Sequence, residues 1–322
     1  MNNWLPTASL QHLKIRAHML AQIRQFFEVR GVLEVETPLM CVASGTDLHL
    51  HPFITHYQET FSAPLKPFYL QTSPEFAMKR LLAAGSGPIY QICKAFRNGE
   101  SGRYHNPEFT MLEWYRPGFA LTQLMDEVEA LLKAILNTEQ AERISYRLAF
   151  KKYLDVDPLT ASVENLKNCA ISNGLIEVNN WQDESHDTWL QLLCSHLIEP
   201  QLGNVNPTFI FDFPASQAAL AKVYGDPPVA ARFEVYVKGV ELANGYHELS
   251  DATEQQRRFE QDLMQRRRAN LPELPISDFL LGALKAGLPD CSGIALGIDR
   301  LMMLLTSAEN LSEVIAFSVE RA

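Results

Sequence analysis

The sequence predicts an α+β fold in which a mainly antiparallel sheet is flanked by helices. Two strand-like stretches, residues 89–96 and 109–115, follow each other in the chain, and residues 232–249 contain two β-rich arms around Lys238 and Gly239. Consecutive strands joined by hairpins pair in the antiparallel sense. In other segments, beginning with residues 9–30, apolar residues recur at helical spacing.

The first segment predicts one helix and one strand. Apolar residues recur every three or four positions over 9–30, and Gly31 follows as a C-terminal cap. Residues 32–38 alternate apolar and polar side chains up to Pro38, whose missing N–H favours a strand end or an edge strand. We expect a second subunit to cover this edge, which would make the protein a homodimer.

A helix start is predicted next, followed by the first hairpin. Residues 72–75 combine a capping hydroxyl, a proline at the first helical position and an acid in the first turn, ahead of the helix-prone residues 76–84. Two glycines and a proline within 85–88 end this helix. The strands 89–96 and 109–115 come next, joined by a long polar loop.

The middle of the chain predicts further helices without a domain boundary. Residues 122–136 form an amphipathic helix, and residues from about 145 to 205 are expected to be a helical insertion rather than a separate domain. A strand is expected at 208–213. Because no low-complexity linker divides the chain, residues 1–322 are expected to form a single domain.

Composition restricts the class of protein. The chain has 322 residues, of which 47% are hydrophobic, and a formal net charge of -10, so nucleic acid is not the expected partner. Its five cysteines include no CxxC pair, which indicates reduced thiols rather than disulfides or zinc ligands, and hence the cytoplasm. No stretch resembles a signal peptide or a transmembrane helix, so no membrane partner is expected.

The strand 109–115 has the side chains of a binding wall. Alternation with period two places Phe109, Met111, Glu113 and Tyr115 on one face. An aromatic ring, an acid and a phenol would thus lie together. The alternative is a sheet with an ordinary half-polar outer face.

Two segments have the features of phosphate sites. The loop 97–108 carries Arg97, Arg103 and His105, and an arginine fork binds two oxygens of a polyphosphate at once. Residues 293–304 predict a strand, a glycine break and an apolar helix with Arg300 in its first turn, where anions are attracted. Solvated loop arginines are the alternative for the first segment.

Glu241 and Glu248 suggest a metal site. They flank Ala243-Asn244-Gly245, whose turn propensity would bring the two carboxylates to one place. Two acids beside phosphates indicate Mg²⁺. The alternative is a hairpin with ordinary surface acids.

A charged helix is expected to begin at Ser250 and Asp251, with Glu254 placed for a capping box. Its five arginines are expected to form a solvated face, and partner docking is the alternative. These arginines are Arg257, Arg258, Arg266, Arg267 and Arg268.

Together these segments resemble the three signature motifs of the class II aminoacyl-tRNA synthetases, in order and at suitable separations. Residues 31–38 are similar to motif 1, residues 96–113 to motif 2 and residues 293–304 to motif 3. The resemblance is closest to lysyl-tRNA synthetase, because residues 72–75 and 241–249 also resemble its lysine and ATP segments. It implies ATP-dependent activation of an amino-acid carboxylate as an acyl-adenylate.

One part of lysyl-tRNA synthetase is expected to have no counterpart here. Its N-terminal OB-fold grips the anticodon and needs on the order of 50 residues, whereas motif 1 begins at Gly31. With Arg103-Tyr104-His105 in motif 2 and residues 289–295 in motif 3, the chain resembles the family of elongation factor P (R)-β-lysine ligases. That resemblance implies transfer of (R)-β-lysine, or lysine, to a lysine side chain of elongation factor P, and tRNA is not expected.

The resemblance implies a role for each matching residue. ATP would be held by Arg97, Asn98, Gly99, Glu100, His105, Asn106, Phe109, Glu241, Leu242, Gly297 and Arg300. The amino acid would be bound by Ser73, Pro74, Glu75, Glu113, Tyr115, Asn244, Glu248 and Ala295. Catalysis would depend on Arg97, Glu241 and Arg300, and Mg²⁺ would be bound by Glu241 and Glu248.

Two residues depart from the lysyl-tRNA synthetase pattern. Gly99 stands where that family has a glutamate that contacts ATP, and Glu100 would have to take its place. Ala295 replaces a glycine, agrees with the ligase family and adds one methyl group to the pocket. Two other interpretations stay open: a truncated synthetase-like enzyme with tRNA or a small molecule as acceptor, and a non-catalytic amino-acid sensor.

Overall fold

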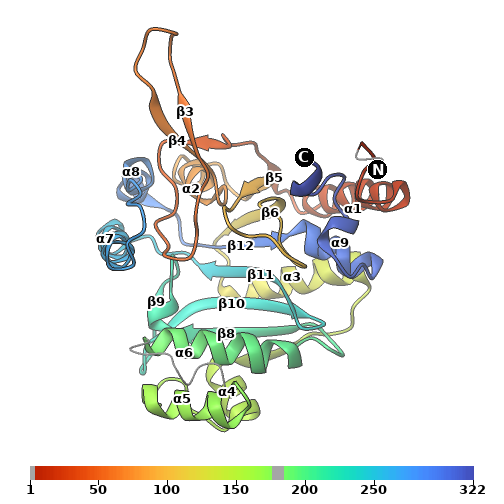
Figure 1. Cartoon of the computed structure of the whole chain (residues 1–322), viewed down its shortest axis with the longest axis vertical. Helices are drawn as coiled ribbons and strands as arrows, with labels where there is room; N and C mark the ends of the chain where they lie inside the picture. The colour runs from red at the N-terminus through yellow and green to blue at the C-terminus, as the bar shows by residue number, and fades with distance from the viewer. Residues whose placement is uncertain (1–3, 176–184) are drawn as a thin grey trace. The chain divides into compact units, whose positions relative to one another are not determined.

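The structure is a computed structural model that describes residues 4–175 and 185–322. The chain divides into two compact units (Figure 1). The first unit consists of Met1–Ala120 and Leu249–Ala322, and the second unit is Leu121–Glu248. No helix in the described part of the chain is both long and apolar enough to cross a membrane.

The first unit contains five α-helices within its described residues, together with seven strands and two short 3₁₀ helices. The helices are α1 (Leu10–Glu28), α2 (Glu75–Ala83), α7 (Ala252–Arg268), α8 (Asp278–Gly287), α9 (Ile298–Thr306), η5 (Leu311–Glu313) and η6 (Val319–Arg321). The strands are β1 (Leu33–Glu34), β2 (Met40–Cys41), β3 (Ile54–Tyr57), β4 (Lys66–Leu70), β5 (Ile89–Phe96), β6 (Glu108–Pro117) and β12 (Cys291–Gly297).

Strands β1, β5, β6 and β12 lie side by side in this order. β1 runs parallel to β5, whereas β5, β6 and β12 are antiparallel neighbours. The apolar stripe of α1 packs on this sheet through the fully buried Phe27. The Phe27 ring stacks on Tyr90 with 4.5 Å between ring centroids and meets the edge of Trp114 at 5.2 Å. Aromatic contacts therefore hold α1 against β5 and β6.

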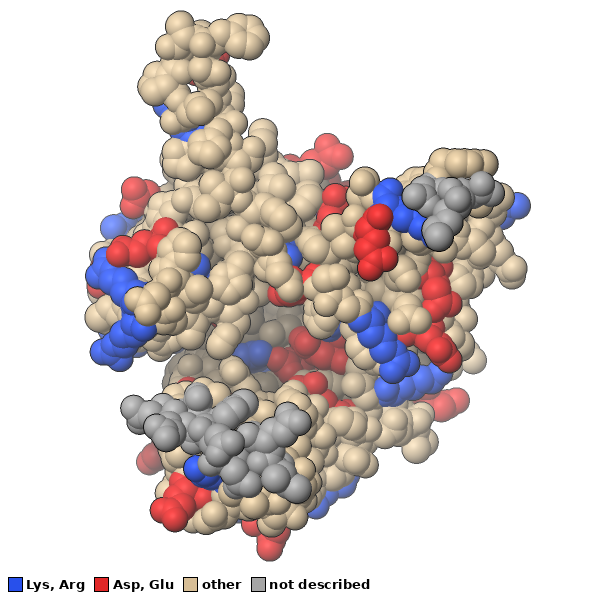
Figure 2. Space-filling model, in the orientation of Figure 1, with Lys and Arg blue, Asp and Glu red and all other residues tan. Residues whose placement is uncertain are grey.

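A second sheet of the first unit, β2-β4-β3, ends in a hairpin that projects away from α2 and β5 (Figure 1). Figure 2 shows that most of the hairpin surface carries no Lys, Arg, Asp or Glu. Ile54, Tyr57, Phe61 and Leu65 are exposed on it. The hairpin therefore carries several exposed apolar side chains.

Most elements predicted for the first unit are confirmed. Ser9 caps α1 by accepting a hydrogen bond from the N–H of His12, and Gly31 follows with φ of 64°. The strand predicted over 32–38 is wrong in length, since only β1 forms. Thr37 bonds the Gln91 side chain at 3.0 Å, and Pro38 has no N–H to donate to a neighbouring strand.

The second unit combines a sheet with helices, and the whole fold is α+β, as predicted. Its helices are α3 (Leu121–Leu136), α4 (Tyr146–Leu154), α5 (Val163–Ser172), α6 (His186–Leu193), the π-helix η2 (Cys194–Ile198), and the 3₁₀ helices η3 (Glu199–Gln201) and η4 (Ala215–Gln217). Its strands are β7 (Glu142–Ser145), β8 (Thr208–Pro214), β9 (Val223–Tyr224), β10 (Val229–Val237) and β11 (Val240–His247).

In this sheet β7 is parallel to β8, and β8, β10 and β11 are antiparallel neighbours, with β9 on part of β10. The hairpin predicted around Lys238 and Gly239 is confirmed, with φ of 52° and 72° at these two residues. The turn predicted at residues 243–245 is wrong. Asn244 lies inside β11 and pairs with Glu234, because the turn at Lys238 has already reversed the chain.

A β-bulge at Leu242 changes the alternation of β11. Val235 pairs with Ala243, but the next residue, Tyr236, pairs with Glu241, so β11 has one residue more than β10. Paired residues of antiparallel strands point to the same face. The bulge therefore turns Glu241 to the face that carries Asn244.

The segment from 145 to 205 is largely helical, as predicted, apart from residues 176–184, which lie outside the described residues. Helices α4, α5 and α6 pack on β8 and β10 through a buried cluster. Its large aromatic members are Tyr146, Phe150, Trp189, Phe213 and Tyr236. This apolar layer explains why the segment folds against the sheet of its own unit.

Candidate active site

The predicted binding wall lies on one face of β6. Tyr115 donates its hydroxyl proton to Glu113 Oε1 at 2.7 Å, which shows that these two side chains share a face. β12 lies alongside, with Ala295 paired to Glu113 and Gly297 paired to Met111. The single methyl group of Ala295 thus lies next to the Glu113 side chain.

Glu113 is connected to the start of α2. It is 2% exposed, and its Oε2 accepts a hydrogen bond from Ser73 Oγ at 3.0 Å. The same Ser73 oxygen accepts from the Glu75 N–H at 3.0 Å. The helix begins one residue later than predicted, because Pro74 is the N-cap residue. Ser73, Glu75, Glu113 and Tyr115 therefore form one polar cluster.

Lys79 belongs to the same cluster and was missed by the sequence analysis. Its Nζ lies 2.6 Å from Glu75 Oε1, one helical turn away, and its side chain is 1% exposed. The signal that could have found it is the i,i+4 order of acid and lysine on an otherwise apolar helix face. A buried lysine requires such a partner.

Arg97 and Phe109 lie together at the base of the loop 97–108. The guanidinium carbon of Arg97 lies 5.0 Å from the centroid of the Phe109 ring. Arg97 Nε is buried without a hydrogen-bond partner among the described residues. An orphaned guanidinium N–H of this kind suits an anion such as a phosphate oxygen.

The turn after Arg97 explains why a glycine stands at position 99. Gly99 has φ of 85°, a conformation that side-chain-bearing residues rarely adopt. Glu100 places its Oε1 3.9 Å from Arg97 Nη1. A carboxylate is thus present beside Arg97, although it comes from the following residue.

Arg300 lies in the first turn of α9 and contacts the loop 97–108. Its Nη2 donates to His105 Nε2 at 2.7 Å, and its Nε donates to the Tyr104 carbonyl at 3.3 Å. His105 Nε2 must accept this bond, so the imidazole carries no proton on that nitrogen. Motif 2 and motif 3 are therefore in direct contact.

Asn98 and Asn106 have structural contacts within the first unit. The Asn98 N–H donates to the His51 carbonyl at 2.7 Å. The Asn106 amide donates to the Glu108 carbonyl at 2.6 Å and accepts from the Val319 N–H at 3.0 Å. Both ends of the Asn106 side chain are thus bound to the backbone, and the residue braces the loop.

A network missed by the sequence analysis supports Arg300. Asp299, 1% exposed, lies 2.6 Å from Arg16 Nη1 and accepts the Thr110 N–H at 2.8 Å. Arg16 Nη2 also donates to Thr110 Oγ1 at 2.8 Å. These bonds join α1, β6 and α9, so they fix the start of the helix that carries Arg300.

In the second unit, Glu241, Asn244 and Glu248 lie along one face of β11 and its end. The buried Asn244 Oδ1 has no hydrogen-bond partner among the described residues. Glu234 lies opposite Asn244 on the neighbouring strand β10. Burial raises the pKa of Glu234, the positive charge of Arg232 counteracts this rise, and the negative charge of Glu241 adds to it. The charge of Glu241 therefore acts on this face.

The turn expected between Glu241 and Glu248 does not form, because residues 243–245 lie inside β11. The expected turn is therefore wrong, and the binding of Mg²⁺ by both carboxylates stays a prediction. In the described residues no three His, Cys, Asp or Glu side chains cluster as metal ligands.

Cys41 and Cys93 have no features of nucleophiles. Burial, followed by the nearby Glu113 charge, raises the pKa of Cys93 to about 12. Burial also raises the pKa of Cys41, to about 11. Thiols of this kind are protonated near neutral pH and react slowly.

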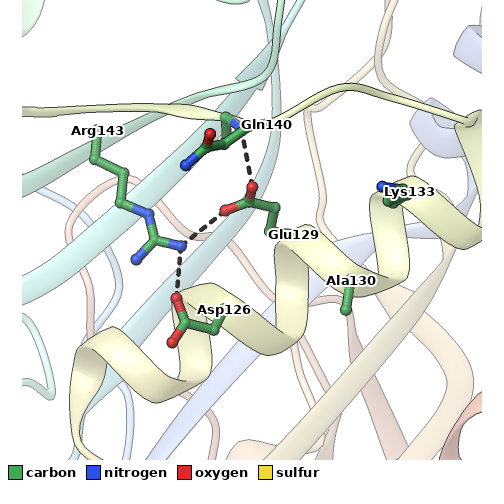
Figure 3. Close-up of a pocket in the computed structure, with 7 residues that line it drawn as sticks. Asp126, Glu129, Ala130, Lys133, Gln140 and Arg143 are labelled. Atoms are coloured by element: carbon green, nitrogen blue, oxygen red, sulfur yellow. Dashed lines mark hydrogen bonds and ion pairs between the residues drawn. The ribbon is translucent and has the colours of Figure 1, made fainter.

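An open groove of about 660 Å³ lies in the second unit between α3 and β7 (Figure 3). Arg143 reaches across it and donates to Asp126 at 2.7 Å and to Glu129 at 2.8 Å. These charges satisfy one another. None of the predicted site residues lines the groove, and we assign it no ligand.

The chain matches one protein family and is similar in sequence to named proteins. Residues 4–321 match the family described as tRNA synthetases class II (D, K and N). The chain is 56% identical over 323 residues to the elongation factor P--(R)-beta-lysine ligase of Edwardsiella ictaluri, which covers 100% of this chain and 99% of that protein. It is 54% identical over 322 residues to the protein of the same name from Salmonella arizonae, covering 99% and 98% respectively.

Proposed function

Because this chain belongs to the class II tRNA synthetases of the D, K and N type, we propose that it is an ATP-dependent ligase that joins an amino acid to a protein. It activates (R)-β-lysine as its adenylate and transfers it to a lysine side chain of elongation factor P. The observation that carries this proposal is the likeness, over almost the full length of both chains, to proteins named for this ligation.

The first-unit cluster fits a diamino acid. Glu75 and Glu113 supply carboxylates for ammonium groups, and Ser73 and Tyr115 fix the orientation of Glu113. Pro74 sets the start of α2, which places Glu75 in its first turn. Asn244 and Glu248 of β11 are assigned to the same substrate, since an unpartnered amide oxygen accepts from an ammonium.

ATP is assigned to the loop 97–108 and to α9. Phe109 provides a ring for adenine, the orphaned Nε of Arg97 suits a phosphate oxygen, and Arg300 adds a second guanidinium at a helix N-terminus. Other contacts are assigned to Asn98, Gly99, Glu100, His105, Asn106, Leu242 and Gly297. The backbone of Asn106 rather than its occupied side chain would make its contact.

The reaction needs two steps at these residues. A carboxylate oxygen of the amino acid attacks the α-phosphorus of ATP, and pyrophosphate leaves. The acceptor amine then attacks the carbonyl carbon of the adenylate, loses a proton and releases AMP, which leaves an amide. Arg97 and Arg300 offset the negative charge that moves to the phosphates, so positioning and electrostatics carry the catalysis.

Magnesium is assigned to Glu241 and Glu248. Mg²⁺ prefers oxygen ligands and usually binds through one or two carboxylates, phosphates and water, and the Leu242 bulge keeps the Glu241 carboxylate on the half-exposed face of β11. When bound with ATP, it neutralises phosphate charge.

Donor selectivity is assigned to Ala295. In β-lysine the amine is attached one carbon farther from the carboxylate than in lysine. The Ala295 methyl group lies beside Glu113 and occupies space that a glycine would leave open. This shape difference would exclude the α-amino arrangement.

The assembly is proposed to be a homodimer in the cytoplasm, without tRNA. Exposed apolar side chains support the dimer: Leu33 on the edge strand β1 is 57% exposed and Met40 on β2 is 50% exposed. The hairpin between β3 and β4, which exposes Ile54, Tyr57, Phe61 and Leu65, belongs to the same unit. Such side chains are commonly covered at subunit interfaces.

The test is to incubate the protein with ATP, Mg²⁺, elongation factor P and either (R)-β-lysine or lysine, and to measure the intact mass of the factor. We expect one β-lysyl addition, larger in yield with the β isomer and absent with Arg300→Ala. Purified tRNA should remain uncharged in parallel. Charging of tRNA, or exchange of pyrophosphate without any addition to the factor, would contradict the proposed acceptor.

A further inference from the structure

The buried pair of Lys79 and Glu75 lies among the residues assigned to the amino acid. The contact is short, 2.6 Å, and exposure is unequal, since the Lys79 side chain is 1% exposed and the Glu75 side chain 16%. A buried ammonium is stable only when an anion lies beside it. The lysine thus occupies the interior side of the pair, and the carboxylate keeps the more accessible side.

This pair is coupled to Glu113 by hydrogen bonds. The backbone N–H of Glu75 donates to Ser73 Oγ, and Ser73 Oγ donates to Glu113 Oε2. A change in the position of Glu75 therefore alters the position of Glu113 through Ser73. The order of the pair along α2, acid before lysine by four residues, also suits the helix dipole.

We propose that Lys79 is a positioning residue for the amino-acid substrate. Its ammonium holds one oxygen of Glu75 and leaves the other for an ammonium group of the substrate. It also offsets one of the two negative charges of Glu75 and Glu113, which lowers the net negative charge that faces the ammonium groups of the substrate. The inference rests on the proposed function, because it takes the amino acid to bind here.

The variant Lys79→Met removes the charge and keeps an unbranched side chain of similar length. Without the ammonium, the Glu75 carboxylate loses its fixed orientation. We expect the KM for (R)-β-lysine in ATP–pyrophosphate exchange to rise roughly ten- to a hundredfold, the effect of losing a hydrogen bond to a charged group. The KM for ATP should stay within about twofold. Lys66→Met, which removes an exposed lysine paired with Glu59, is the matched control and should change neither constant.

A double-mutant cycle separates positioning from a general structural role. If Lys79 acts through Glu75, then Glu75→Gln and the double variant Glu75→Gln/Lys79→Met should have the same KM for the amino acid. If Lys79 has only a structural role, the fold increase in KM of the double variant should be the product of the increases in the two single variants. Thermal unfolding of each variant shows whether it is folded at the assay temperature.

Two results would overturn the inference: an unchanged amino-acid KM in folded Lys79→Met, or multiplied effects in the cycle. If Lys79→Met does not fold, Lys79→Gln, which keeps a donor without the charge, is measured instead. It should show a smaller rise in the same constant, and no rise would overturn the inference. If the wild-type protein shows no pyrophosphate exchange in the presence of either lysine isomer, the proposed function is refuted instead.

Discussion

The backbone conformation at Gly297 does not require a glycine. Its φ of −76° is open to other residues, and an added Cβ would meet only the Arg300 side chain at 3.8 Å, an ordinary contact. In the proposed site, however, this residue lies where adenosine approaches the backbone. A larger residue at position 297 is therefore expected to affect ligand binding and not folding.

We expect Gly297→Ala to raise the KM for ATP at least about tenfold, because an extra methyl group in a closely packed contact costs about 1–3 kcal/mol. The melting temperature should be unchanged. Gly282→Ala on α8, where an added Cβ meets no atom within 4 Å, is the control and should leave the KM unchanged. An unaltered KM in Gly297→Ala would remove Gly297 from the adenosine site.

Other single residues show which properties the sequence could predict. Glu113 and Tyr115 were found because strand alternation is local, and their hydrogen bond confirms the shared face. Arg266 was expected to be solvated, which is wrong. It is 1% exposed and donates to the carbonyls of Pro272 and Asp47. Its burial depends on a loop more than two hundred residues away, which no local pattern encodes.

At the scale of elements, α7 begins as predicted but is capped differently. Asp251 is the N-cap and accepts from the N–H groups of Thr253 and Glu254. The expected capping box is wrong, because the Glu254 carboxylate accepts from Arg257 and Arg258 instead. These bonds, chiefly that from Arg257, lower the pKa of Glu254 to about 2.

This shift gives α7 a pH-dependent contribution to the free energy of unfolding. The folded pKa of Glu254 lies below the ordinary 4.5, so the contribution is complete above about pH 4.5 and is lost as the pH falls toward about 2. Glu254→Gln should therefore lower the stability at pH 7 by about 0.5–1 kcal/mol, a small value because both arginine contacts are near the surface. Urea unfolding at pH 7, 5 and 4 should show the difference between variant and wild type begin to shrink at the lowest pH. A constant difference over this range would contradict the assignment.

The strands show the same division between local and non-local information. The Lys238-Gly239 turn was predicted because it lies between two β-rich arms, and both of its residues have positive φ. The second turn at Asn244 was wrongly predicted from turn propensity. Asn244-Gly245 is a turn sequence by composition, but pairing with Phe233 and Glu234 of β10 overrides it.

At the scale of the whole molecule, the order of the motifs predicted the class of fold and the chemistry, and the family match agrees with both. Contacts between motifs could not be predicted. The bond between Arg300 and His105 joins residues almost two hundred positions apart. Sequence spacing contains no information about such a distance.

The proposed dimer can be tested with two leucines of equal exposure. Leu33 on β1 is 57% exposed and Leu148 on α4 is 58% exposed. Because a lysine at a subunit interface has to be desolvated, Leu33→Lys should convert the dimer to monomers, whereas Leu148→Lys should not. Light scattering after size-exclusion chromatography measures the mass. A monomeric wild type, or a dimeric Leu33→Lys, would refute this interface.

The bulge at Leu242 sets the phase of β11. On one side of it the half-exposed face follows one parity of residue number, and on the other side it follows the opposite parity. Loss of Leu242 alone would remove the extra residue and restore regular alternation, with Glu241 still opposite Tyr236 and still on the face of Asn244. In homologous chains, the residue of β10 that the glutamate faces therefore matters more than the number of residues that separate it from Asn244.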